Sequence, residues 1–477
     1  MSVSKKSMNS PPTHTGSQVG RTQDPADLTG FYSLRPGAVW GWLRTEHLSF
    51  WAICSYLFVE YVRPQRIITA LDILPWAYLF LLLAFLGMFV DRSRRWVRHP
   101  ANLWVAIFSL LLLVSCFTAI YQDEAWKHFE WYFQWWAIYT LIVVIVNSER
   151  RFLVFLAIFM IATFKISIFG ARTWAMRGFA FTKWGLVGPP GYFENSGELA
   201  IQMLMFAPIA YEVAIFVRPY VGRLTFYVLL MMPITAAMTV MGASSRGGQL
   251  GLAYQAYRSL IKGRLSFKVL VSVGVLAVIA WQILPDEQKA RFSSSGSDRT
   301  SQQRLLYWKH GWDMMLDRPM TGVGYFGFAP YYQDHFPDDL LYGVPQLPHN
   351  IFIQVGTDAG FPGLIAFLMV IYINLRTARD IQKLAREHGP ASRPRDGPAT
   401  PAGNSSVVDD KPFAAIAKGL AIACWGFVIA GQFVTVSYYP FLWINLALTV
   451  CLHNIAKQHY LGPLGVTTRK PLQPSAY

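Results

Sequence analysis

The stretch LWVAIFSLLLLVSCFTAIY, residues 103–121, carries no charged side chain and has about the length of a helix that crosses a lipid bilayer. Further apolar stretches of this kind occur throughout the 477-residue chain, at 48–62, 68–90, 131–146, 152–168, 196–217, 224–241, 248–261, 267–284, 351–375, 414–434 and 441–455. We therefore predict an all-α, polytopic integral membrane protein with about 12 transmembrane helices. In chain order, the first stretch (48–62) and the eighth (248–261) are short, and their ends are the least well defined.

The composition supports the same class of protein. Hydrophobic residues make up 53% of the chain and charged residues only 14%, whereas about a quarter of a soluble chain is charged. This excludes a soluble enzyme, a disordered protein and a disulfide-framed secreted domain. The net charge of +15 points to cytoplasmic loops and anionic membrane lipids, and no nucleic-acid partner is expected. The four cysteines lie inside apolar stretches, which favours buried side chains over disulfides.

Basic residues in alternate loops predict the orientation, because loops rich in Lys and Arg stay in the cytoplasm. They place both termini in the cytoplasm, and only Arg63 and Arg66 depart from the pattern. The predicted organisation is a flexible N-terminal tail (1–46), transmembrane helices 1–9 (47–284), an outside loop (285–350), helix 10 (351–375), a cytoplasmic linker (376–412), helices 11 and 12 (413–456), and a C-terminal tail (457–477).

A charged turn interrupts the apolar pattern at Ser244-Ser245-Arg246-Gly247-Gly248. A charge at the membrane boundary is costly unless it reaches the headgroups or faces a wet cavity. Arg246 therefore either reaches the headgroup layer or binds an anion, for which the planar guanidinium fork suits phosphate.

The long outside loop is rich in Trp, Tyr, Phe and Gly, so we expect it to be ordered and to contain short amphipathic helices. Its clearest helix covers 305–316 and ends before Pro319. The apolar residues that recur at helical spacing there are Leu305, Trp308, Trp312 and Met315. A helix lying on the membrane surface explains this pattern equally well. Arg304 stands at its start, and Arg291 and Arg299 precede it.

At the end of this loop, His349-Asn350 precedes the apolar stretch 351–375. Asn350 is a good helix N-cap. His349 would stand at the positive end of the helix dipole, which favours the neutral imidazole that a general base requires. A histidine that only bonds the helix end remains the alternative. The ten histidines show no metal-ligand spacing, so no metal site is expected.

An ordered set of motifs resembles the O-antigen ligase and polymerase superfamily. It comprises S-R-G at 245–247, R-x-x-x-W from Arg304, P-x-x-G-x-G from Pro319, HN at 349–350, and an acidic-x-G-x-x-G turn from Asp358, where the family more often has Glu. EYVRPQ (60–65) and VGPPGYFEN (187–195) resemble the exosortase-associated subgroup of O-glycosylation ligases, although Glu194-Asn195-Ser196 departs from the Asn-rich pattern of relatives.

The resemblance implies a bacterial inner-membrane glycosyltransferase whose periplasmic site takes a glycan from undecaprenyl pyrophosphate without a metal or other cofactor. The acceptor would be a lipid A-core sugar, as in lipopolysaccharide biosynthesis, or a protein Ser/Thr hydroxyl. His349 would be the catalytic base, and Arg246 and Arg304 would hold the pyrophosphate. Lesser candidates for phosphate or glycan contact are Arg299, Arg291, Asn350, Lys183, Arg172 and Tyr325.

Three alternatives stay open. A polymerase of the same superfamily would share the loop chemistry and differ in its acceptor. A transporter of lipid-linked glycan would be expected to show repeat symmetry and polar residues in mid-membrane, and neither is evident. A structural partner in a secretion complex is the third.

Overall fold

The computed structural model describes residues 36–66, 68–182, 185–260, 282, 289, 298–388 and 412–462, and within them every regular element is a helix. The elements are α2 (Pro36–Leu43), α3 (Leu48–Val62), η1 (Pro64–Arg66), η2 (Thr69–Leu71), α4 (Trp76–Val90), α5 (Pro100–Thr118), α6 (Gln122–Lys127), α7 (Glu130–Ile145), α8 (Glu149–Met176), α9 (Ser196–Val217), α10 (Arg223–Gly242), α11 (Arg246–Leu260), α14 (Arg299–Asp317), α15 (Phe328–His335), η3 (Pro337–Asp339), α16 (Ile351–His388), α17 (Phe413–Ala430), η6 (Gly431–Phe433) and α18 (Pro440–Leu461). The predicted all-α class is confirmed for these residues.

Six helical segments among the described residues are long and apolar enough to cross a membrane: Pro100–Thr118, Glu149–Met176, Ser196–Val217, Arg223–Gly242, Ile351–His388 and Phe413–Phe433. Two shorter apolar helices, Leu48–Val62 and Trp76–Val90, accompany them. The apolar stretch predicted at 267–284 lies outside the described residues. The chain is therefore a membrane protein, and the number of about 12 crossings stays a prediction.

Helices extend into two stretches that were predicted to be a linker and a tail. The helix predicted to end at residue 375 continues as α16 to His388, into the stretch expected to be a linker. The ion pairs Arg376–Asp380 (3.9 Å) and Lys383–Glu387 (3.7 Å) follow the i,i+4 spacing that supports an exposed helix. Near the other terminus, α2 occupies part of the predicted flexible tail.

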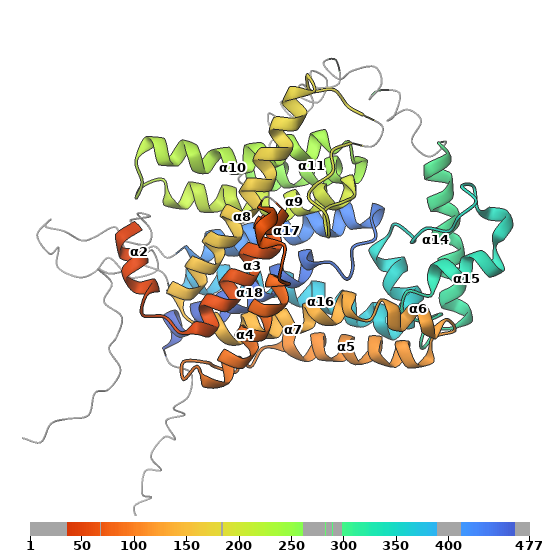
Figure 1. Ribbon diagram of the computed structural model, residues 1–477, viewed down its shortest axis with the longest axis horizontal. Coiled ribbons are helices and arrows are strands. Elements are labelled where there is room, and N and C mark those ends of the chain that lie inside the picture. Colours follow the sequence, from red (N-terminus) through yellow and green to blue (C-terminus); the bar gives the residue numbers. More distant parts are fainter. Residues whose placement is uncertain are drawn as a thin grey trace, which may run out of the picture.

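The bundle is built around α9, whose side chains are buried on nearly all sides. An apolar helix of this kind belongs in the centre of a bundle. It packs against α8, α10, α11, α17 and α18, while α16 lies between α5 and α17 (Figure 1). One large cluster of buried side chains joins these helices, and the four cysteines are buried within them, as predicted.

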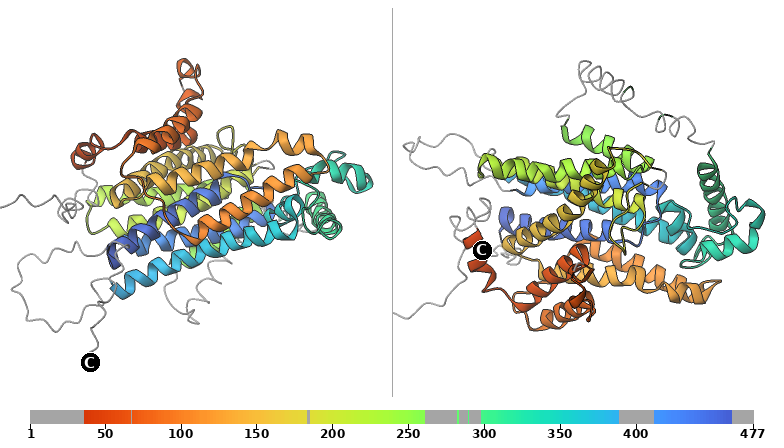
Figure 2. Two further views of the ribbon diagram at one scale, coloured as in Figure 1. Left: turned by 90° about the horizontal axis from the view of Figure 1, so that it is seen from below. Right: turned by 45° about the horizontal axis from the view of Figure 1, so that its top comes forward.

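A cap covers one end of the bundle, and we use this name for residues 298–348. It contains α14 and α15, which lie together beyond the bundle helices (Figures 1 and 2). A small core of its own holds the cap together, made of Tyr307, Met314, Val323, Phe328 and Tyr332. The backbone N–H of Val323 donates to the carbonyl of Thr357 at 2.8 Å, which ties the cap to α16. The long loop is thus ordered in this part, as expected.

The amphipathic helix in the loop is confirmed as α14, but its predicted apolar face is wrong in part. Leu305 and Trp312 are exposed, while Tyr307 and Met314 are fully buried. The spacing of apolar residues could not distinguish these two faces, because both carry large hydrophobic side chains. The packed face is the one that meets α15 and α16.

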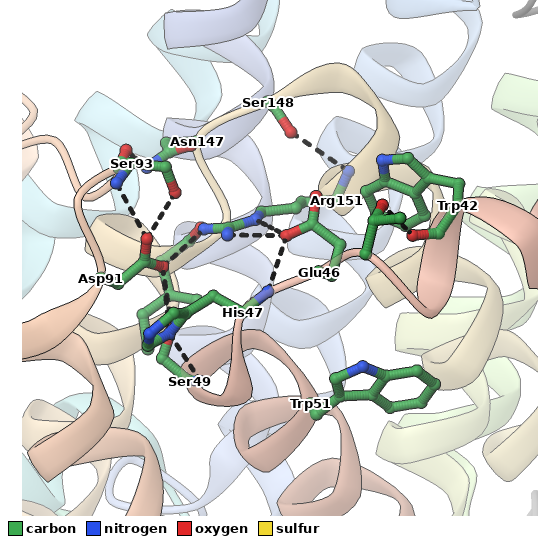
Figure 3. Close-up of polar contacts among 12 residues, drawn as sticks. Trp42, Glu46, His47, Ser49, Trp51, Asp91, Ser93, Asn147, Ser148 and Arg151 are labelled. Atoms are coloured by element: carbon green, nitrogen blue, oxygen red, sulfur yellow. Dashed lines mark hydrogen bonds and ion pairs between the residues drawn. The ribbon is translucent and has the colours of Figure 1, made fainter.

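A buried ion-pair network joins the N-terminal helices where α3 and α8 begin and α4 ends (Figure 3). Arg151 is almost fully buried and contacts Glu46 at 2.7 Å and Asp91 at 3.0 Å. Ser49 also donates to Asp91 at 2.8 Å. Buried charges of this kind need such complete pairing to be tolerated. This network therefore stabilises the packing of these helices.

Candidate active site

Three helices begin around residues 431–439, the segment between α17 and α18. A Cβ atom added to Gly247 in the first turn of α11 would lie 2.7 Å from the Phe433 ring, and one on Gly197 of α9 would lie 2.7 Å from Val434. A Cβ atom added to Gly431 would lie 2.9 Å from the side chain of Ile351, the first residue of α16. The N-termini of α9, α11 and α16 therefore converge here, and helix N-termini favour anions.

Arg246, predicted either to reach the headgroup layer or to bind an anion, is the first residue of α11, so the predicted turn at residues 244–248 continues directly into this helix. Ser244 in that turn has a φ of 55°, a left-handed conformation that is rare for serine. The guanidinium Nη2 of Arg246 contacts Asp298 Oδ2 at 2.6 Å, and both side chains are partly exposed. Asp298 also caps α14, since its Oδ1 accepts the N–H of Ser301 at 3.0 Å. One carboxylate thus joins the starts of α11 and α14.

Arg304 lies on α14 in the same cluster of charges. Its Nε atom is buried and has no hydrogen-bond partner among the described residues. Burial and the positive charge of Arg246 lower the pKa of Arg304, and Asp298 and Tyr342 oppose this effect. Two arginines therefore lie close together beside the carboxylate of Asp298, and such a pair of cations favours a bound anion.

His349 precedes α16 with a φ of 51°, again in the left-handed region. Its backbone N–H donates to Thr435 Oγ1 at 2.8 Å, and its ring Nε2 lies 3.2 Å from Gln346 Oε1. Burial, followed by the charge of Arg304, lowers the pKa of His349 to about 4. The imidazole is consequently neutral near pH 7, as expected, although burial and Arg304 rather than the helix dipole account for it.

Asn350 fixes the backbone beside this histidine. Its Oδ1 accepts the N–H groups of Phe352 at 2.8 Å and Ile353 at 3.2 Å, so the predicted N-cap is present. The amide oxygen is occupied by these bonds, and the side chain is buried. Asn350 thus holds the start of α16 in place.

The remaining candidates are not all close to this cluster. Arg299 is exposed, donates to the carbonyl of Leu341 and lies 5.0 Å from the Tyr342 ring centroid. Arg172 is exposed on α8. Lys183 and Arg291 lie outside the described residues.

Tyr325 corrects one expectation, because it is fully buried and cannot stack on a sugar. Its ring packs on Phe326 at 4.9 Å and on Tyr438 at 5.0 Å between centroids. The sequence could not exclude this, since an aromatic side chain suits a core as well as a binding surface.

Sequence reasoning missed Asp298 and Thr435, which hold Arg246 and His349. The signal for Asp298 was present, since an Asp directly before a helical pattern is a typical N-cap. Thr435 comes from a distant part of the chain, and no local pattern indicates its contact. Among the residues that the structure describes, no group of three His, Cys, Asp or Glu side chains is placed to hold a metal ion.

Two family models match the chain. Residues 230–368 match the model described as O-Antigen ligase, and this range contains Arg246, Arg304 and His349. Residues 42–211 match the model described as Family of unknown function (DUF5935). The comparison with curated proteins found no match.

Proposed function

We propose that this chain, a membrane protein with an O-antigen ligase domain at residues 230–368, transfers a glycan from undecaprenyl pyrophosphate to an acceptor hydroxyl. The family match supports a glycosyltransferase-type membrane enzyme that uses a lipid-linked glycan and an acceptor. The donor, the acceptor and the catalytic residues are our proposal.

The observation that carries it is the charge cluster of Arg246 and Arg304. The Nε of Arg304 is buried without a hydrogen-bond partner among the described residues, and the positive charge of Arg246 lies close enough to lower the pKa of Arg304. A pyrophosphate supplies negative charge and several oxygen acceptors to this pair of cations. Guanidinium groups bind such oxygens through paired N–H bonds.

The same groups have suitable roles in the transfer. The acceptor hydroxyl oxygen attacks the anomeric carbon of the glycan while the neutral ring of His349 takes its proton. The bond from that carbon to the pyrophosphate oxygen breaks, and the bond electrons leave with the undecaprenyl pyrophosphate. Arg246 and Arg304 stabilise the charge that develops on the departing oxygen.

The basic loops support a site on the periplasmic face of the inner membrane, with both termini in the cytoplasm. The acceptor in this proposal is a lipid A-core sugar or a protein Ser/Thr hydroxyl. A polymerase that extends the glycan itself is the alternative within the same family. Reporter fusions after Asp334 and after Arg386 test the topology, which requires opposite sides of the membrane.

The test of function is a transfer assay with the purified full chain in detergent. Undecaprenyl-pyrophosphate glycan is offered with lipid A-core or with an acceptor protein, with and without EDTA. We expect transfer by the wild type in either condition, and none by a stably folded His349→Ala variant. Full transfer by His349→Ala contradicts the base assignment, chain lengthening without an acceptor favours the polymerase, and loss of activity in EDTA contradicts metal independence.

A further inference from the structure

Two stretches far apart in the sequence meet on one side of the bundle. They are EYVRPQ (60–65), at the end of α3, and VGPPGYFEN (187–195), before α9. A Cβ atom added to Gly191 would collide with the guanidinium of Arg63. This close approach brings the two stretches together, and the φ of 106° at Gly191 is a conformation that favours glycine. Both stretches lie in the part of the chain that matches the family of unknown function.

Between these stretches and the start of α7 lies a cavity of about 330 Å³. This volume is within the range of small-molecule sites, roughly 300–1,000 Å³. Its lining includes Glu60, Arg63, Glu130, Trp131, Gln134 and Tyr192, together with two further tyrosines. We call it the α3–α7 cavity.

The lining combines acidic groups with aromatic rings. Arg63 Nη2 contacts Glu60 Oε1 at 3.3 Å, and both side chains are largely shielded. This pair explains why Arg63 departs from the charge pattern of the loops. With Glu130 added, the cavity carries more negative than positive formal charge. Gln134 donates its amide N–H to the hydroxyl of Tyr192.

The α3–α7 cavity adjoins the candidate active site through aromatic contacts. The ring centroid of Tyr439 lies 5.4 Å from that of Tyr192 and 5.5 Å from that of Trp131. Tyr439 belongs to the same 431–439 segment as Thr435, which holds the backbone of His349. Its hydroxyl also donates to Glu198 at 3.0 Å. A ligand in the cavity would therefore contact Trp131 and Tyr192, whose rings pack on the segment that positions the histidine.

We propose that the α3–α7 cavity is a carbohydrate subsite, which binds one sugar residue of the donor glycan or of the acceptor. This rests on the proposed function. Carboxylates and an amide are hydrogen-bond partners for sugar hydroxyls, and aromatic side chains offer apolar surface to the C–H face of a sugar ring. The excess of negative charge disfavours a phosphate or a phospholipid headgroup with net negative charge. The pyrophosphate thus belongs at Arg246 and Arg304, and the sugar in this cavity.

The test compares Glu130→Gln and Trp131→Ala with Glu124→Gln, a matched substitution on the neighbouring helix α6 outside the cavity. Direct binding to the purified full chain is measured by saturation-transfer NMR and calorimetry. The probes are lipid-free core oligosaccharide for the acceptor and a short-chain polyprenyl-pyrophosphate glycan for the donor. We expect both cavity variants to weaken the binding of the same probe about tenfold, Glu130→Gln through loss of a charged hydrogen bond and Trp131→Ala through loss of aromatic contact. Glu124→Gln should bind as the wild type does.

The probe that is weakened identifies the source of the sugar. In the transfer assay, the same variants should raise KM for that substrate with kcat changed less than about twofold, as for lost ground-state binding. Unchanged binding of both probes by both folded variants overturns the subsite. The subsite is also overturned if the only effect of Glu130→Gln is that phosphatidylethanolamine no longer binds to the purified chain. If oligosaccharide binding depends on Glu130 and Trp131 but no transfer occurs, the subsite stands and the proposed function fails.

Discussion

Protonation of His349 offers the sharpest test of the proposed base. Its pKa is lowered to about 4, first by burial and then by Arg304. At pH 5.5 a histidine with that pKa is roughly 97% neutral, whereas one with the usual pKa of about 6.5 is roughly 9% neutral. Because only the neutral ring accepts a proton, the two cases differ about tenfold in active enzyme at this pH.

The direction of the pKa shift of His349 determines how activity changes with pH. A lowered pKa keeps the base active as the pH falls through 6.5, and activity is lost only towards pH 4. Replacing Arg304 by Gln removes the positive neighbour while burial remains. The pKa of His349 should therefore rise, and the acid limb of the profile should move to higher pH.

The assay is kcat/KM for glycan transfer from pH 4.5 to 8, since this ratio reports groups in the free enzyme. Profiles are normalised to their plateaus, because Arg304→Gln should also weaken pyrophosphate binding. Lys309→Gln removes an exposed charge from the same helix and serves as the matched control. If the acid limb of the wild-type kcat/KM profile lies near pH 6.5, or if Arg304→Gln does not move it, this explanation of the pKa of His349 is wrong.

Three further outcomes are expected. Arg246→Lys should lower kcat about a hundredfold, because a point charge cannot replace the guanidinium fork; normal turnover would make Arg246 only an anchor. Asn350→Ala should lower the free energy of unfolding by roughly 0.5–2 kcal/mol in denaturant titrations, while Asn350→Asp should keep most of it, and equal losses would argue against capping. Asp91→Asn should lower the free energy of unfolding by about 3 kcal/mol, because Arg151 loses a buried charged partner, and an unchanged melting temperature would contradict a stabilising role of the Arg151 network.

Apolar patterning predicted most helices, because the lipid-spanning length and the caps are local properties. The predicted 196–217 stretch coincides with α9, whose start is marked by the Asn195–Glu198 capping box. The stretch at 68–90 begins too early, since α4 starts only at Trp76, directly after Pro75. The end of α16 was missed because its last turns are polar, and length of apolar sequence says nothing about them.

For the site as well, the sequence indicated residues that have a local signal but not the contacts that depend on the tertiary fold. Arg246, Arg304 and His349 stood out because charge and imidazole are unusual beside apolar spans, and the structure brings Arg304 within electrostatic reach of the other two. The N-cap position of Asp298 had a local signal, but its pairing with Arg246 and that of Thr435 with His349 could not be deduced, since each pairing joins segments distant in the sequence. The α3–α7 cavity was hidden for the same reason.

The strained backbone at this end of the bundle has a consequence for evolution. Ser244, Phe326 and His349 all have φ between 51° and 57°. His349 bonds Thr435, Phe326 packs on Tyr438, and Ser244 is three residues before Gly247, which lies against Phe433. Each such conformation costs a non-glycine residue about 1–2 kcal/mol. A His349→Gly chain would relieve that strain and melt at a higher temperature while losing its base. Selection for stability alone would thus remove the histidine, so its persistence in a lineage would require continued selection for activity.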